Sequence, residues 1–289
     1  MFRCSYIVLI RNNEASIAKL VDSLKKIRGD FRKEYIFVDD GSSDDSLSLL
    51  KKEVNDLPRT TIITQEPQGP SISVNKALSL ASGDYVHFVE GSEELLPEST
   101  SLLMDACVKL GTEVAIGLVS KNPQQKYTPT RIQKIIENPI YDILSGKKGI
   151  VRNLGKSGTI INTKLLDKVE GADSSIYTQN MSLSLRCAKY TKFAILDDYV
   201  TINSTDKENT EIKFTTYNNL KAIHNFAREN PEICSKYVSQ MLSCLARESI
   251  NFIDRAKLRA QFFLTKFIIN TTSLEQVLKL YKAELDKLF

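Results

Sequence analysis

Two adjacent carboxylates, Asp39 and Asp40, follow an apolar run at residues 35–38. Ligands of an open parallel sheet bind outside the carboxyl ends of its strands, so these side chains are expected to face a crevice. A carboxylate at that place can accept N–H and O–H groups of a ligand. Because Gly41 follows, the alternative is an ordinary Asp-Gly turn in which Asp39 is merely a strand-end residue. The segment predicts a ligand site, with that turn as the competing interpretation.

Alternating strand and helix patterns surround this segment and must position it. Apolar runs predict strands, and amphipathic spacing predicts helices. The predicted strands are 5–10, 34–38, 60–64, 85–89, 113–119 and 158–162. The predicted helices are 15–26, 44–54, 71–81, 97–110, 132–145 and 163–169. Right-handed crossovers place such strands in one mostly parallel, Rossmann-related sheet flanked by helices, an α/β fold.

Local turn chemistry supports this order of elements. Ser42 or Ser43 is expected to N-cap the helix over 44–54. A glycine-rich passage over 146–158 is either an acceptor-side loop or a string of turns. His87, inside a predicted strand, is expected to be a packed residue.

From about residue 215 the pattern changes to successive amphipathic helices. We therefore expect a main domain over 1–210 and a helical C-terminal subdomain over 211–289. Bases and aromatics alternate over 255–269, so this helix could rest on an anionic membrane surface or dock on a partner. The alternative is an amphipathic helix packed on its own domain.

Composition excludes several classes of protein. The chain has 289 residues, 26% of them charged, and a net charge of +4, so no nucleic-acid partner is expected. Its five cysteines are scattered and never in a CxxC spacing, which is typical of reduced residues in a cytosolic protein. No run approaches the ~20 apolar residues that span a bilayer. We expect a soluble, cytoplasmic protein, with peripheral attachment at the inner face of the membrane left open.

Five motifs follow one another between residues 4 and 204. They are an Asn-Glu pair at Asn13-Glu14, Val-Asp-Asp-Gly-Ser at 38–42, a Gly69 turn before an Asn75 helix, Ala-x-Gly-Asp-Tyr-x-x-Phe at 81–88, and an acidic cluster before Leu-x-Pro at 90–97. In this order they resemble the family 2 glycosyltransferases with a GT-A fold.

The resemblance implies a nucleotide-sugar donor, UDP- or GDP-linked, and an acceptor that is a glycan, lipid or protein. It also implies inversion at the anomeric carbon. Asp39 and Asp40 would contact the base and ribose of the donor. The other residues implied at the donor site are Asn13, Glu14, Gly69 and Asn75.

The metal motif of the family departs from its usual form here. The Asp-x-Asp that holds a divalent cation reads Glu90-Gly91-Ser92. Glu90 with Ser92 and Glu93 could still hold Mn²⁺ or Mg²⁺, since Mg²⁺ often takes only one or two carboxylates plus substrate phosphates. The alternative is that Glu93 and Glu94 are solvated charges at a helix start. A divalent cofactor is therefore left open.

The base position departs in a similar way. Where the family has a carboxylate pair before a Leu-x-Leu-Arg helix, this chain has Gln179 and Asn180. Amides keep the hydrogen-bonding reach but take no proton at neutral pH, and loss of a general base costs ~10²- to 10⁴-fold in rate. Asp173 could substitute as the base, and so could Glu170.

Three functions are compatible with these residues. The first is an active glycosyltransferase. The second is a catalytically impaired scaffold that pairs with another copy or an active transferase through its C-terminal helices. The third, a Rossmann dehydrogenase, is disfavoured because residues 11–14 stand where its glycine fingerprint belongs.

Overall fold

A computed structural model describes residues 1–122, 130–145, 154–156, 158–203, 211–237 and 240. The strands are β1 (Arg3–Ile10), β2 (Arg32–Asp40), β3 (Thr60–Gln65), β4 (Tyr85–Glu90), β5 (Glu93–Leu95), β6 (Val114–Ser120), β7 (Gln133–Ile136), β8 (Thr159–Asn162) and β9 (Phe193–Asn203). The helices are α1 (Ile17–Lys25), α2 (Ser46–Glu53), α3 (Pro70–Leu78), α4 (Ser99–Leu110), α5 (Pro139–Ser145), α6 (Thr163–Lys168), α7 (Asn180–Ala188), α8 (Glu211–Glu229) and α9 (Pro231–Lys236), with a 3₁₀ turn at Val54–Asp56.

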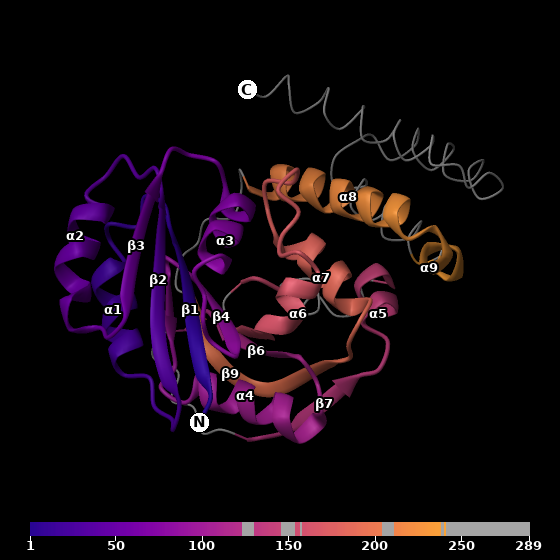
Figure 1. The fold of residues 1–289 in the computed structure, drawn as a ribbon, viewed down its shortest axis with the longest axis horizontal. Coiled ribbons are helices and arrows are strands. Elements are labelled where there is room, and N and C mark those ends of the chain that lie inside the picture. The colour runs from indigo at the N-terminus through magenta and orange to yellow at the C-terminus, as the bar shows by residue number, and fades with distance from the viewer. Residues whose placement is uncertain (123–129, 146–153, 157, 204–210, 238–239, 241–289) are drawn as a thin grey trace. The chain divides into compact units, whose positions relative to one another are not determined.

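The described strands form one sheet in the order β3-β2-β1-β4-β8-β6-β9-β5, and β7 pairs with β9 (Figure 1). The strands β3, β2, β1 and β4 are parallel to one another, which is the predicted βαβ arrangement. β8 runs antiparallel to both β4 and β6, while β6 and β9 are parallel. The α/β fold with a sheet flanked by helices is thus confirmed. The sheet itself is mixed, because β3-β2-β1-β4 and the pair β6-β9 are parallel while its other pairs are antiparallel.

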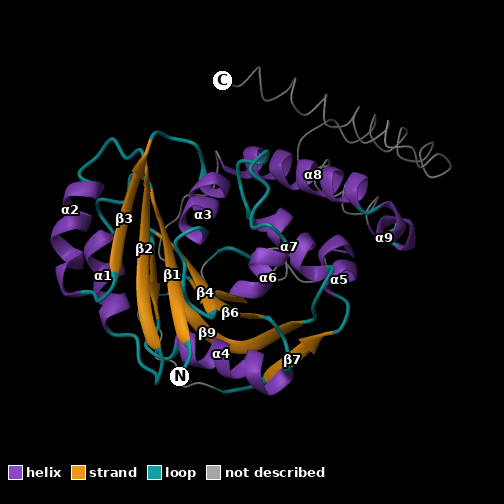
Figure 2. Ribbon diagram, in the orientation of Figure 1, coloured by secondary structure: helices purple, strands orange, loops and turns teal. Residues whose placement is uncertain are grey.

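Helices cover both faces of the parallel half of the sheet. Figure 2 shows α1 and α2 on one side of β1 and β2, with α3 on the other. β1 is buried along both faces because Tyr6 and Val8 enter the core cluster under α1, whereas Ile7 faces the opposite side. Burial on both faces explains the near-continuous apolar runs of these strands.

Chain contacts divide the molecule into two compact units. One comprises residues 1–139 and 150–205, and the other comprises 140–149 and 206–289. In the second unit the described elements are helical, and α8 contacts α9. The predicted boundary at residue 210 and the helical subdomain over 211–289 stay predictions, and the basic-aromatic segment 255–269 lies outside the described residues.

Two sequence predictions fail in the middle of the chain. The predicted helix over 132–145 is wrong in its first half, because β7 pairs there with β9 and α5 begins only at Pro139. Proline disfavours helical backbone in the residue before it and is well suited to the first helical turn. The strand β9 was not predicted, although it completes the second half of the sheet.

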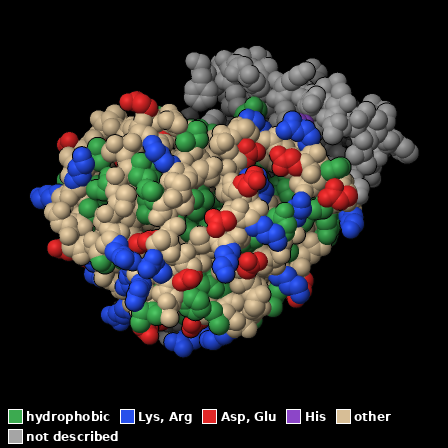
Figure 3. Space-filling model, viewed as in Figure 1, with side chains coloured by type: hydrophobic (Ala, Val, Ile, Leu, Met, Phe, Trp, Pro, Cys, Tyr) green, Lys and Arg blue, Asp and Glu red, His purple; other side chains and the backbone are tan. Residues whose placement is uncertain are grey.

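Other expectations about single residues hold. His87 is fully buried, lies 3.0 Å from the Thr100 hydroxyl and stacks on Tyr6. Cys4, Cys107 and Cys187 are buried and free. Acidic and basic side chains are interspersed on the face drawn in Figure 3, in line with the nearly balanced charge. None of the helices in the described part of the chain is long and apolar enough to cross a membrane.

Candidate functional site

The carboxyl ends of β1, β2 and β4 meet at one edge of the sheet. In the register of these parallel strands Ile10 pairs with Asp39 on one side, and Leu9 pairs with Glu90 on the other. The predicted nucleotide carboxylates and the predicted metal residues therefore flank β1 at the same edge. Open parallel sheets bind their ligands at this edge.

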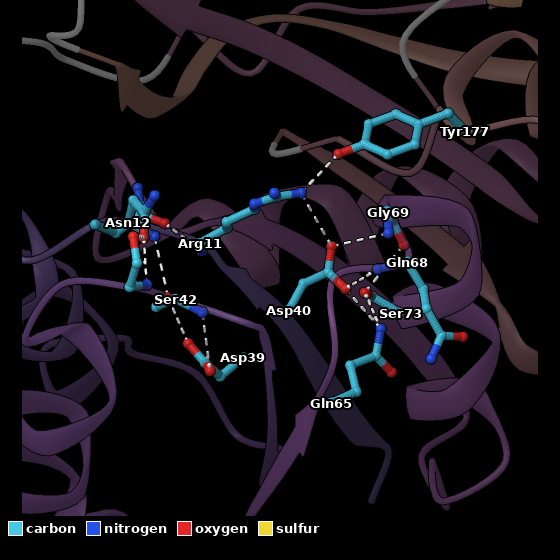
Figure 4. Close-up of polar contacts among 12 residues, drawn as sticks. Arg11, Asn12, Asp39, Asp40, Ser42, Gln65, Gln68, Gly69, Ser73 and Tyr177 are labelled. Atoms are coloured by element: carbon cyan, nitrogen blue, oxygen red, sulfur yellow. Dashed lines mark hydrogen bonds and ion pairs between the residues drawn. The ribbon is translucent and has the colours of Figure 1, made fainter.

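Asp39 is 3% exposed and faces the turn that follows β2. One of its carboxylate oxygens accepts the Ser42 hydroxyl at 2.5 Å, and the other accepts the Ser42 amide at 3.3 Å (Figure 4). The prediction that Ser42 or Ser43 caps the next helix is wrong. That helix begins at Ser46, whose amide is bound instead by the Asp44 carboxylate at 3.0 Å.

Asp40 organises the loop between β3 and α3. Its carboxylate accepts hydrogen bonds from the Gln65 side chain, the Gln68 amide and the Gly69 amide, each at 2.8 Å. The guanidinium of Arg11 lies 3.8 Å from the same carboxylate (Figure 4). Asp40 is 5% exposed, because these protein groups surround it.

Gly69 allows this loop to pass under an aromatic ring. Its φ is +93°, and a Cβ at this position would lie 2.5 Å from the ring of Tyr177. The Tyr177 carbonyl accepts the Ser71 amide at 3.1 Å, and its hydroxyl accepts Arg11 at 3.0 Å. The 170–180 segment is thereby joined to the ends of β1 and β2.

Sequence reasoning missed Arg11 and Tyr177, which lie beside Asp40 and Gly69. Arg11 had a signal, because a guanidinium directly after a buried strand must lie at the ligand edge. Tyr177 had none, since its place over Gly69 depends on a contact between segments more than one hundred residues apart.

Asn13 and Glu14 occupy the turn after β1. The side-chain oxygen of Asn13 accepts the Arg11 backbone N–H at 2.8 Å, and the Asn13 backbone N–H donates to the Ser46 hydroxyl at 2.7 Å. The Glu14 amide donates to the Asp44 carboxylate at 3.2 Å, while Glu14 itself is exposed. Asn13 shapes the turn, and Glu14 lies at its surface.

Asn75 ties α3 to the segment that precedes α7. Its side-chain amide donates to the Ala172 carbonyl and accepts the Ala172 amide, both at 2.8 Å. The reciprocal pair fixes the orientation of the Asn75 side chain. This residue therefore positions the loop that precedes α7, and its contact with a donor stays a prediction.

The predicted metal residues lie at the end of β4 and in β5. Glu93 is 4% exposed, accepts the Asn203 amide at 3.0 Å and lies 3.4 Å from the Glu90 amide nitrogen. Burial, with the Glu90 carboxylate nearby, raises the pKa of Glu93 to about 8. The interpretation of Glu93 as a solvated charge at a helix start is wrong, because it is buried in a short strand. Ser92 is half-buried between them.

These residues do not fit a conventional divalent site. The Nζ of Lys156 lies 3.6 Å from a Glu90 oxygen, so a cation of the chain already faces that carboxylate. Within the described ranges no group of three or more acidic, histidine or cysteine side chains is arranged to hold a metal ion. Hard divalent cations prefer several oxygen ligands.

The predicted catalytic residues lie at and before the start of α7. Gln179 is 2% exposed and donates to the Gly155 carbonyl at 2.6 Å. Asn180 is 7% exposed, and its side-chain oxygen has no hydrogen-bond partner among the described residues. Asp173 accepts the Ser175 amide at 2.9 Å. The side chain of Glu170 is 86% exposed and lies 3.9 Å from Arg186.

Comparison with known proteins agrees with this geometry. The model of glycosyl transferase family 2 matches residues 5–183. The poly(ribitol-phosphate) beta-glucosyltransferase of Bacillus spizizenii is 25% identical over 209 residues, which make up 68% of this chain and 31% of that protein. The chain spans at most 34% of the length of the curated relatives that it matches.

Solved structures share the fold at low identity. TarS of S. aureus in complex with UDP-GlcNAc has a TM-score of 0.62 and 19% identity, over 90% of this chain and 77% of that one. The mannosyltransferase PcManGT of Pyrobaculum calidifontis, in complex with GDP-Man and Mn²⁺, has a TM-score of 0.62 and 13% identity, over 99% and 86%. The family match covers more than half of the sequence. The chain therefore belongs to glycosyl transferase family 2 and adopts a GT-A fold.

Proposed function

We propose that this protein is a glycosyltransferase that moves a sugar from a nucleotide-sugar donor to a hydroxyl of a glycan, lipid or protein acceptor, with inversion at the anomeric carbon. Family membership supports the reaction class. The observation that carries the proposal is Asp39, a buried carboxylate at the carboxyl end of a central parallel strand.

Asp39 and Asp40 have different roles in this proposal. Asp39 accepts hydrogen bonds from the base or ribose of the donor, because its bonds to Ser42 leave acceptor capacity on both oxygens. Asp40 already receives three hydrogen bonds from the 65–69 loop and has Arg11 beside it, so it holds the wall of the donor site. Solved complexes of proteins with this fold contain UDP-GlcNAc or GDP-Man, which supports a UDP- or GDP-linked donor.

On the acceptor side we assign two roles: Asn180 orients the attacking hydroxyl of the acceptor, and Asp173 removes the proton of that hydroxyl. The buried side-chain oxygen of Asn180, which has no partner within the described part of the chain, can accept a hydrogen bond from the attacking hydroxyl. A carboxylate must take the proton, since an amide takes none, and Asp173 is the candidate nearest in sequence to α7 after the exposed Glu170 is set aside. Each group then does one step: Asn180 orients and Asp173 deprotonates.

The test is release of UDP or GDP from a panel of UDP-hexoses, UDP-N-acetylhexosamines and GDP-mannose, with and without glycan and lipid acceptors. We expect release from one donor class, reduced about 10- to 100-fold in Asp39→Asn. The matched control is Asp45→Asn, an exposed carboxylate without a side-chain cap bond, which should stay within about twofold. Folded wild-type protein that turns over no donor would contradict the proposal.

A second candidate is a donor-binding scaffold without catalysis, and the amides at Gln179 and Asn180 favour it. Such a subunit would pair with an active transferase, or with another copy, through the helices of 211–289. The distinguishing variant carries Ser92→Asp and Asn180→Asp. A large gain in donor hydrolysis would identify a scaffold that lacks only its reactive groups, whereas an active wild type would exclude this candidate.

A further inference from the structure

Three successive residues of a short segment before β8 accept or donate hydrogen bonds, two of them with Gln179 and α7 and the third with the first residue of β8. The Leu154 amide donates to the Ser184 hydroxyl at 3.3 Å. The Gly155 carbonyl accepts the Gln179 side chain at 2.6 Å, and the Lys156 carbonyl accepts the Thr159 hydroxyl at 2.6 Å. The backbone at Lys156 is therefore fixed on both sides of its Cα.

Close packing adds to these bonds. Gly155 has a φ of +80°, and a Cβ there would lie 2.7 Å from Leu183 and 2.8 Å from the Gln179 side chain. Only glycine lets the backbone come this near to α7 at that φ. The position of Lys156 thus depends on Gln179 both through a hydrogen bond and through contact.

The Lys156 side chain extends from this segment to the end of β4. Its ammonium lies 3.6 Å from a Glu90 oxygen, and the two side chains are 41% and 31% exposed. A ligand can therefore reach both. Glu90 pairs in register with Leu9, next to the position where Ile10 pairs with Asp39, so the ammonium belongs to the same ligand edge.

This placement puts a cation of the chain where the GT-A resemblance expects a metal. Ser92 stands at one expected carboxylate position, and the buried Glu93 is already bonded to Asn203. An ammonium has three N–H donors, so it can contact a carboxylate and a phosphate oxygen together, as a bridging divalent ion would.

We propose that Lys156, positioned by Gln179, binds the diphosphate of the donor in place of a divalent cation. This inference rests on the proposed function. It also connects the two departures from the family pattern, because the bond to the Gly155 carbonyl requires a donor, and an amide at residue 179 supplies one where a carboxylate could not. The amide at Gln179, the first residue of the pair, and the altered acidic cluster then both serve diphosphate binding.

The test is calorimetric titration of UDP and GDP, and of uridine and guanosine, each in EDTA and in Mn²⁺. For the wild type we expect diphosphate affinity that differs less than about twofold between EDTA and Mn²⁺. Lys156→Ala should weaken diphosphate binding about tenfold or more and leave nucleoside binding unchanged, because a charge-assisted bond is lost. Lys156→Arg should bind diphosphates with an affinity within about threefold of the wild type, since a guanidinium keeps the charge.

Two further variants separate this role from general damage. Lys164→Ala removes an exposed lysine of α6 and should bind like the wild type. Gln179→Glu should weaken diphosphate binding and leave nucleoside binding unchanged, since it displaces Lys156 without altering the residues proposed to contact the nucleobase and ribose. Circular dichroism of each variant checks the fold.

Two results would overturn the inference while leaving the proposed function standing. One is a tenfold or larger gain in wild-type diphosphate affinity on adding Mn²⁺, and the other is Lys156→Ala that binds diphosphates as the wild type does. Absence of binding to every nucleotide and nucleoside, together with no donor turnover, would remove the inference and the proposed function at once.

Discussion

The side-chain amide of Gln179 donates a 2.6 Å hydrogen bond to the carbonyl of Gly155, and this bond is buried. It joins the start of α7 to the segment that carries Lys156. The residue expected to stand near the base of a transferase therefore has a structural partner of its own.

Gln179→Glu should destabilise the fold by about 1–3 kcal/mol, because a buried carboxylate would face the Gly155 carbonyl with no proton to donate. Urea unfolding near neutral pH measures the change. Gln133→Glu on the partly exposed β7 is the control and should change stability by less than about 0.5 kcal/mol. Equal effects of the two variants would show that the buried bond contributes little.

Gly69→Ala should destabilise the fold more than Gly111→Ala does, although both glycines have positive φ. A methyl group at Gly69 would lie 2.5 Å from the Tyr177 ring, whereas at Gly111 no atom of the described residues lies within 4 Å. Gly111 has left-handed helical backbone, which costs alanine about 1 kcal/mol, whereas the backbone of Gly69, at φ 93° and ψ 164°, is nearly exclusive to glycine and costs about 1–3 kcal/mol. The clash with the ring adds about 1–3 kcal/mol at Gly69 alone. Thermal unfolding of both variants is the measurement, and adding Tyr177→Ala should remove the part of the difference that the clash causes. No recovery of stability on this addition would contradict the assignment to the ring.

Glu93 should make the protein less stable as pH rises through the neutral range. Its pKa is raised from 4.5 to about 8 in the folded state, so between these values the unfolded chain releases a proton that the folded chain keeps. The stabilisation is complete below about pH 4.5 and is lost by about pH 8. Glu93→Gln should remove this dependence of stability on pH. Its free energy of unfolding should gain on the order of 2 kcal/mol over that of the wild type between pH 5 and pH 8. Denaturant unfolding at a series of pH values tests it, with the adjacent Glu94→Gln as the control; parallel profiles for wild type and Glu93→Gln would contradict it.

His87 should have the opposite effect at acid pH. Burial lowers the pKa of His87 from 6.5 to about 3, so the unfolded chain binds a proton in this range and the folded chain does not. Stability should then fall as pH drops below about 6.5. His87→Gln keeps a hydrogen-bonding group beside Thr100 and removes the titrating imidazole. The loss of stability between pH 7 and pH 4 should therefore be smaller by about 2 kcal/mol. An unchanged acid limb in melting experiments would show that other groups cause it.

The sequence by itself determined the parallel half of the fold. Strands β1, β2 and β4 are buried on both faces, so each appears as an apolar run with a helix pattern after it. The same reasoning located Asp39 and Asp40, because a polar residue directly after such a run must lie at the ligand edge. Glu90 was located by the resemblance to the metal motif of the family. These predictions depend on neighbours in the chain, which a sequence displays.

Only the tertiary structure decided what those side chains contact. The burial of Glu93 depends on pairing between β5 and β9, and the place of Tyr177 depends on Gly69. The Lys156–Glu90 pair joins residues from two distant segments, and no local spacing encodes it. The reason is physical: propensity and periodicity act over a few residues, whereas the charge and burial at a site are set by whichever segments the folded sheet brings together.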